Sequence, residues 1–154
     1  MADAAINFYK ADLRAIRFTL YDHLKVQRLF ELDEYSHLSR EECDAIIDQC
    51  LRFAMEVTGP LNAAGDRAGC RFEHGRVTTP PGFKEAWRTL FELGLMSFTM
   101  PVKAGGFGGP HAIGVILGEL QSGANTAFNM YPGLTHGAAD LLERFALPED
   151  QQRF

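Results

Sequence analysis

A chain of 154 residues is about one domain long, which is enough to bury an ordinary hydrophobic core. With 46% hydrophobic and 23% charged residues, the composition is that of a soluble globular protein and excludes intrinsic disorder. The net charge of −5, from 15 basic and 20 acidic side chains, argues against a general affinity for nucleic acid, which requires basic surface.

Cysteine spacing and hydropathy bear on the compartment. Cys43 and Cys50 lie seven residues apart on one predicted helix, which separates them by about 10 Å. A disulfide requires Cα atoms within about 7 Å, so we interpret these residues and Cys70 as reduced, buried thiols. The sequence shows neither a signal-peptide pattern nor an apolar run of about 18 residues, so we expect a cytoplasmic protein without a membrane span.

The first helical pattern lies near the N-terminus. Apolar residues recur there at three- and four-residue steps, namely Leu13, Ile16, Leu20 and Leu24. This spacing places them on one face and predicts a helix over about residues 12–29.

A second helix is predicted to begin at Ser39, where a serine followed by Glu42 forms a capping-box pattern. An apolar stripe from Cys43 to Ala54 continues this helix, and Gly59-Pro60 is expected to end it, with Pro60 opening a further helical turn. Acidic residues spaced along the helix are interpreted as a solvated face: Glu41, Asp44 and Asp48.

The middle of the chain changes character. Residues 65–81 are poor in apolar residues and rich in turn formers, which predicts an irregular excursion with one small hairpin near 70–80. A helical face follows from Phe83 to Phe91, and Gly94 is a suitable residue for the left-handed position after its C-terminus.

The last third contains a glycine-rich loop (95–110) and three helical segments. One helix spans about residues 113–120 and carries Gly114 and Gly118 on one face, where we expect close backbone packing. Ser122-Gly123 is expected to separate it from a helix over 124–145 that is kinked at Pro132. A final helix is expected from Pro148. The predicted class is therefore all-α, a bundle of about five to seven helices.

Common patterns of catalytic and metal sites are missing. The loop 105–109 is neither a G-x-G-x-x-G nor a Walker sequence, so we interpret it as a tight loop beside a pocket and not as a phosphate cradle. The five histidines form no H-x-x-x-H or H-E-x-x-H pair, no G-x-S-x-G elbow occurs, and no metal site is expected. Glu119 is interpreted as a surface or capping residue.

One group of polar residues suggests a binding surface. Asn125, Thr126, Asn129 and Gly133 follow helical spacing among apolar neighbours, close to the predicted kink. Such a mixture is typical of a cleft lining, but it also fits a polar stripe that faces water or another subunit. Spacing alone leaves both interpretations open.

Several motifs occur in a characteristic order. They are Phe83-Lys84-Glu85-Ala86-Trp87, Leu93-Gly94-Leu95, Gly105-Gly106-Phe107-Gly108, Glu119, Ala124-Asn125 and Pro148-Glu149-Asp150-Gln151-Gln152. This order resembles the N-terminal helical domain of the acyl-CoA dehydrogenases. Motifs in the front half, such as Gly65-Asp66 and Gly69-Cys70, resemble the long bacterial branch that includes the 3-methylmercaptopropionyl-CoA dehydrogenases. The resemblance covers nearly the whole chain.

The resemblance implies an FAD-dependent enzyme that removes two hydrogens from an acyl-CoA thioester. It also implies an electron-transfer acceptor, a homo-oligomer, and a middle β-barrel and C-terminal bundle outside this chain. Most flavin contacts and the glutamate base belong to those parts, so no catalytic residue is expected here, and the chain alone should be inactive and free of flavin. The resemblance places Asn125, Thr126, Asn129 and Gly133 at the acyl-chain end of the pocket.

We therefore expect an N-terminal extension and helix over 1–35 and the helical domain over 36–154. The leading hypothesis is the N-terminal part of an FAD-dependent acyl-CoA dehydrogenase. The alternative is a non-enzymatic helical module, or a split-enzyme subunit, that docks on a partner chain; its apolar surplus near Leu13–Leu24 and Ile113–Leu120 motivates it. A third hypothesis is an acyl-CoA or lipid binder without catalysis.

Overall fold

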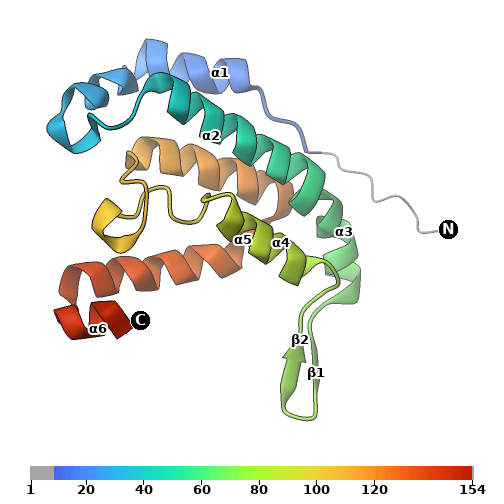
Figure 1. Ribbon diagram of the computed structural model, residues 1–154. Coiled ribbons are helices and arrows are strands. Elements are labelled where there is room, and N and C mark those ends of the chain that lie inside the picture. Colours follow the sequence, from blue (N-terminus) through green and yellow to red (C-terminus); the bar gives the residue numbers. More distant parts are fainter. Residues whose placement is uncertain (1–8, 154) are drawn as a thin grey trace.

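The helices expected from the sequence are present in the computed structural model, which describes residues 9–153 (Figure 1). Residues 1–8, the start of the expected extension, lie outside this range. The elements are α1 (Leu13–Arg17), α2 (Arg40–Phe53), α3 (Gly59–Ala68), β1 (Arg71–Glu73), β2 (Arg76–Thr78), α4 (Phe83–Glu92), α5 (His111–Phe145) and α6 (Pro148–Arg153). The predicted all-α class with one small hairpin is therefore confirmed.

The first predicted helix is shorter than the sequence pattern suggested. After α1, a π-helical turn carries the chain to His23, and Lys25 then adopts a left-handed conformation with φ of 58°. Short 3₁₀ turns at Val26–Glu31 and Asp33–Tyr35 follow. Tyr21 and Val26 both enter the core, although an unbroken helix would place them about 140° apart. The prediction of a helix to residue 29 was wrong because burying both residues requires a bend.

The start of α2 confirms the predicted capping box. The Glu42 amide donates to the Ser39 hydroxyl at 3.2 Å, and the Ser39 amide donates to the Glu42 carboxylate at 2.7 Å. Two of the carboxylates predicted to be solvated instead face α1, where Arg17 pairs with Asp44 at 3.1 Å and Asp48 at 2.8 Å. These half-buried ion pairs fix α1 across α2.

The helical path does not stop at Gly59-Pro60 as predicted. A π-helical turn at Ala54–Thr58 joins α2 to α3, which begins at Gly59 and has Pro60 in its first turn, as expected for that residue. The helix runs to Ala68, so the first residues of the predicted irregular excursion are helical. The segment after it forms the β1–β2 hairpin, which projects from the helices in Figure 1.

The long helix α5 is interrupted, but not where the sequence predicted. Asn125 has φ of −157° and ψ of 87°, whereas Ser122-Gly123 and Pro132 lie within helical backbone. In Figure 1 the chain reverses direction there, so residues 111–124, the first half of α5, run opposite to residues 126–145, the second half. The expected kink at Pro132 was wrong, because contacts of the Asn125 side chain set the bend.

The core lies between α2, α4 and both halves of α5. Its largest fully buried apolar side chains are Tyr21, Phe128, Leu20, Ile47, Leu90, Ile113 and Leu120. The C-terminus of α4 is confirmed, since Gly94 follows it with φ of 68°. Among residues 9–153, no helix is long and apolar enough to cross a bilayer.

Candidate functional site

The glycine loop uses its backbone donors internally. Four consecutive amides, those of residues 106–109, donate to the carbonyl oxygens of Pro101, Ser97, Met100 and Phe98 at 2.8–3.2 Å. A phosphate cradle requires a row of free amides, and this loop has none. A side chain at Gly106 or Gly109 would collide with Met100 or Phe98, so these glycines serve close packing.

Asn125 holds the two halves of α5 together at the reversal. Its side-chain oxygen accepts from the Phe128 amide at 2.9 Å and so caps the second half. Its amide group donates to the Thr58 carbonyl oxygen at 2.9 Å, which ties the reversal to the π-helical turn between α2 and α3. The residue is 1% exposed, so both polar groups are committed to the backbone in this chain.

The other three predicted site residues lie on the second half of α5. Thr126 is exposed, and its hydroxyl donates to the Ser122 carbonyl oxygen at 2.7 Å. Asn129 donates to the Ser122 hydroxyl at 2.7 Å and, together with Gly133, lines a small cavity. The structure therefore brings Asn129 and Gly133 together and gives Asn125 and Thr126 other contacts.

The small cavity, which we call the inter-half cavity, opens between the two halves of α5. It has a volume of about 170 Å³. Its lining residues are Leu95, Met96, Phe98, Thr99, Gly114, Leu117, Gly118, Gln121, Asn129, Pro132, Gly133 and His136. Thr99, Gln121 and His136 were not predicted as site residues. Gln121 follows Gly118 by three positions on one helix face, and that spacing is the signal that would have found it.

The two glycines predicted to allow close packing behave differently. A Cβ at Gly114 would lie 2.5 Å from the Thr99 methyl group, so this glycine is confirmed as a packing residue. A Cβ at Gly118 would meet no atom within 4 Å, and the same holds for Gly133. Each glycine costs about 1 kcal/mol of helix stability relative to alanine. Packing among residues 9–153 does not account for Gly118 and Gly133.

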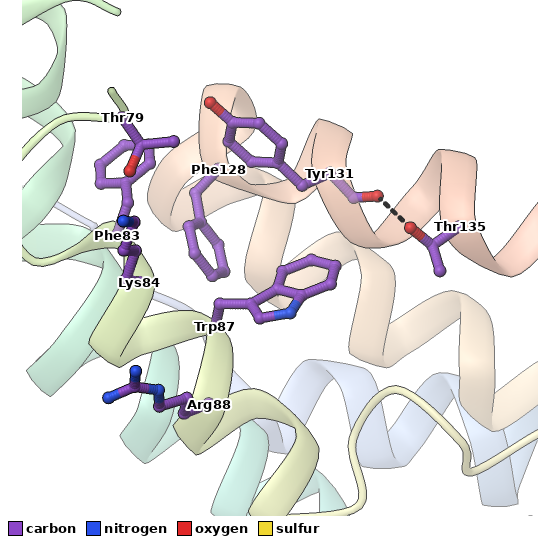
Figure 2. Close-up of a pocket in the computed structure, with 8 residues that line it drawn as sticks. All are labelled: Thr79, Phe83, Lys84, Trp87, Arg88, Phe128, Tyr131 and Thr135. Carbon is purple, nitrogen blue, oxygen red and sulfur yellow. Dashed lines mark hydrogen bonds between the residues drawn. The ribbon is translucent and has the colours of Figure 1, made fainter. Parts of the chain in front are cut away.

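A larger cavity of about 430 Å³ lies between α4 and the second half of α5 (Figure 2). Its walls are aromatic: Phe83, Trp87, Phe128 and Tyr131. Phe83 meets Phe128 edge-on with ring centroids 5.5 Å apart, and Tyr131 lies 6.2 Å from Phe83 in the same manner. None of the predicted site residues lines this cavity. We interpret it as an aromatic contact between helices, flanked by Lys84 and Arg88.

The described residues were compared with the requirements of a metal site and of a buried catalytic carboxylate. No group of three histidine, cysteine or carboxylate side chains within residues 9–153 is arranged to hold a metal ion. Glu119 is exposed on the first half of α5, as a surface residue would be.

Comparison with known proteins extends these observations. Residues 40–154 match the family model described as acyl-CoA dehydrogenase, N-terminal domain. The chain belongs to the acyl-CoA dehydrogenase family. It is 33% identical over 134 residues to a 3-methylmercaptopropionyl-CoA dehydrogenase from Ruegeria pomeroyi, an alignment that covers 87% of this chain and 23% of the relative. It is also 31% identical over 150 residues to a butyryl-CoA dehydrogenase from Syntrophomonas wolfei, covering 95% of this chain and 24% of the relative.

The chain therefore spans about a quarter of the length of these acyl-CoA dehydrogenases. The glycine loop, the turn at Asn125 and both cavities all fall within the matched residues 40–154. The recognised resemblance to the N-terminal helical domain of this family is thus confirmed.

The thiols of this acyl-CoA dehydrogenase domain differ in accessibility. Cys43 and Cys50 are fully buried, as predicted, and no disulfide is present within residues 9–153. Burial raises the pKa of Cys43 to about 11 and that of Cys50 to about 12. Cys70, predicted to be buried, is exposed beside the hairpin, 3.6 Å from the Tyr131 hydroxyl.

We expect a thiol-specific reagent to modify only Cys70 in the folded protein. The buried thiols combine high pKa values with no solvent contact, so they should react only after unfolding. Titration with Ellman's reagent at pH 8, with and without urea, measures this difference. A Cys70→Ser variant is the control and should react only in urea. Rapid modification of more than one thiol without denaturant would contradict the burial of Cys43 and Cys50.

Proposed function

We propose that this chain is the N-terminal part of an FAD-dependent acyl-CoA dehydrogenase and supplies one wall of its acyl pocket. The reaction is the α,β-dehydrogenation of an acyl-CoA thioester. Family membership supports this proposal, as do two relatives whose names specify short acyl-CoA substrates.

The observation that supports the proposal most directly is the exposed apolar surface beside an open cavity on the second half of α5. Asn129 and Gly133 border an open cavity on one side of this helix. On the same helix, exposed apolar side chains form a row at helical spacing: Met130, Leu134, Leu141 and Phe145. An apolar row next to a polar cavity is what one wall of an acyl pocket requires when other residues form the remaining walls.

The described residues do not fit a flavin by themselves. The glycine loop has no row of free amides for a pyrophosphate. We therefore place the flavin, which accepts the hydride in this class of reaction, and the catalytic base in parts of the enzyme outside residues 9–153. We propose no catalytic residue in this chain.

We expect Gly133→Val to lower kcat/KM of the whole enzyme at least about 10-fold, with a loss that grows with acyl-chain length. The added side chain enters space that none of the described residues fills, so it should exclude the ligand with little effect on packing. The measurement is dehydrogenase activity of protein from the complete reading frame, assayed with a series of acyl-CoA thioesters and an artificial electron acceptor.

Ala127→Val is the matched control, because it adds the same type of side chain at an exposed position of the same helix. Its activity should stay within about twofold of the parent enzyme. Unchanged kinetics of Gly133→Val would remove this helix from the acyl pocket. A complete protein that binds no flavin and oxidises no acyl-CoA would overturn the proposed function itself, whereas the isolated chain should be colourless and inactive.

The exposed apolar row also favours a second candidate function. In a split enzyme, the same side chains would dock on a partner chain that carries the flavin-binding parts. Co-purification of a second chain with flavin would support this reading. Sedimentation that shows the chain alone as a stable monomer at high concentration would contradict it.

Several expectations from the sequence remain proposals. We infer a homo-oligomeric enzyme in the cytoplasm that passes electrons to a separate acceptor. We also propose the division into an extension over 1–35 and a domain over 36–154. Leu20 and Tyr21 of the first segment share the core with α2, so the extension would be firmly packed on the domain.

A further inference from the structure

The β1–β2 hairpin has no polar contact with the helices among the described residues. Residues 71–78 are all exposed, and none of them forms a hydrogen bond or an ion pair with a helix within residues 9–153. The hairpin projects from the helices in Figure 1. A two-stranded hairpin alone is only marginally stable in water, so this one would gain stability from a further strand.

The turn of the hairpin decides which backbone groups are free. Residues 74–75 both have positive φ, 51° and 75°, as in a two-residue turn of type I′. The turn pairs Glu73 with Arg76 and Phe72 with Val77. Hydrogen-bonded and non-hydrogen-bonded pairs alternate along antiparallel strands, and the pair that closes such a turn is hydrogen-bonded. The N–H and C=O groups of Phe72 therefore point away from β2, to the outer edge of β1.

The two faces of the hairpin differ in polarity. Phe72 and Val77 lie opposite each other on one face and are 72% and 65% exposed. Arg71 and Glu73 point to the other face, because side chains alternate along a strand. An exposed strand edge beside apolar side chains is a template for pairing with another chain.

The order of residues in β1 favours a second copy of the same strand. β1 consists of a basic residue, an aromatic residue and an acidic residue, Arg71-Phe72-Glu73. When two such strands pair antiparallel about a two-fold axis at Phe72, Arg71 of each copy lies opposite the partner's Glu73. Each such pair of opposite charges contributes about 0.2–1 kcal/mol, and like charges there are destabilising. β2 lacks this self-complementarity, because it has Arg76 and Thr78 around its central residue.

The paired hairpins would form a four-stranded antiparallel sheet with β1 strands at its centre. On one face, Phe72 and Val77 would continue into the same two residues of the partner as one apolar row. On the other face, Glu73 would lie between Arg76 of its own hairpin and the partner's Arg71. Only three residues of each strand meet, so the contact is smaller than the roughly 1,200 Å² of a stable interface, and we expect weak association.

We propose that β1 is a contact between two copies of this chain, which pair antiparallel about Phe72. The contact uses the same patch on both copies, so it closes at a dimer. This inference rests on the proposed function only in giving the homo-oligomer inferred above a defined contact.

The first test uses charge reversal in the 154-residue chain. Arg71→Glu and Glu73→Arg should each weaken self-association at least about 10-fold, because each places like charges opposite each other at both ends of the contact. An equimolar mixture of the two variants should associate about as tightly as the parent chain, since all the facing charges are then opposite. Sedimentation equilibrium over a series of concentrations measures the three dissociation constants.

Arg76→Glu is the matched control for the mixture. It makes the same change of charge as Arg71→Glu, on the same hairpin, but on β2. Its mixture with Glu73→Arg retains like charges at one end of the β1 contact, so it should not recover the association of the parent. Circular dichroism should show an unchanged helix content in all three variants, because the substituted residues are exposed.

The second test locates the two-fold axis by disulfide trapping in a Cys70→Ser background. Phe72→Cys places two thiols at the axis with Cα atoms about 5.5 Å apart, which is within disulfide range. Val77→Cys is the control on the same face, three strand spacings from its copy, or about 14 Å. We expect the covalent dimer to form at least about 10-fold faster with Phe72→Cys, measured by non-reducing electrophoresis.

Three results would each overturn the proposal: a parent chain that stays monomeric at its highest soluble concentration, a mixture that associates no better than either variant alone, or equal trapping at the two positions. The hairpin would then be left to another partner, such as another part of the enzyme. None of these measurements depends on flavin or acyl-CoA, so a failure of the proposed dehydrogenase activity is distinguishable from a failure of this inference.

Discussion

Replacing Asn125 with alanine is expected to lower the free energy of unfolding by about 3 kcal/mol. Loss of the cap on the second half of α5 costs about 1 kcal/mol. Leaving the Thr58 carbonyl oxygen without its donor adds about 1–3 kcal/mol, because the bond is buried. Urea denaturation measures the change, with the helix signal followed by circular dichroism at about 222 nm.

Thr126→Ala is the matched control for this prediction. Its hydroxyl bonds only to a carbonyl oxygen of the preceding turn and is exposed, so the change should stay within about 0.5 kcal/mol. If Asn125→Ala were equally mild, apolar packing alone would hold the reversal of α5, and the role assigned to the Asn125 side chain would be wrong.

Phe128→Ala is expected to destabilise the fold by about 3–5 kcal/mol, because it leaves a cavity in the core. Phe128 is 1% exposed, and its ring lies 6.4 Å from Phe53, 5.5 Å from Phe83 and 6.4 Å from Tyr131. Removing it separates α2, α4 and the second half of α5 at once. The same urea measurement determines the loss.

Phe145→Ala tests whether burial explains this cost. It is the same substitution on the same helix, but Phe145 is 78% exposed, so we expect less than about 0.5 kcal/mol. Equal losses for the two variants would mean that Phe145 packs against other residues in solution and that the uncovered face of α5 is not free.

Features set by neighbouring residues could be predicted from the sequence. The capping box at Ser39 and Glu42 spans three residues, and the left-handed Gly94 ends the helix directly before it. Pro148 opens α6 for an equally local reason. Each of these three features is caused by residues next to one another in the sequence, and all three are present in the structure.

The two breaks in helical pattern could not be placed from local sequence. Lys25 adopts a left-handed conformation that its residue type does not favour, because the core requires both Tyr21 and Val26. Asn125 forms its bond to Thr58, 67 residues away in the chain. In both cases distant contacts decide the backbone. Ser122-Gly123 predicted a break two residues before Asn125, but the sequence did not indicate that Asn125 itself would leave the helical conformation.

The residues of the candidate site likewise divide into those that the sequence indicated and those that only the fold brings together. Helical spacing and family resemblance selected four residues of α5, and two of them, Asn129 and Gly133, line the inter-half cavity. Thr99 and Gln121 escaped notice because they come from a loop and from the opposite half of α5. Only the reversal at Asn125 brings them to the same space.

Because α5 doubles back at Asn125, the facing walls of the inter-half cavity are neighbours in the gene as well as in space. Gly118, Gln121, Asn129 and Gly133 all belong to one 35-residue stretch. Recombination within so short a segment can exchange both walls together and leave α2, α3 and α4 untouched. The lining of this cavity can therefore change as a single inherited unit, independently of the helices that support it.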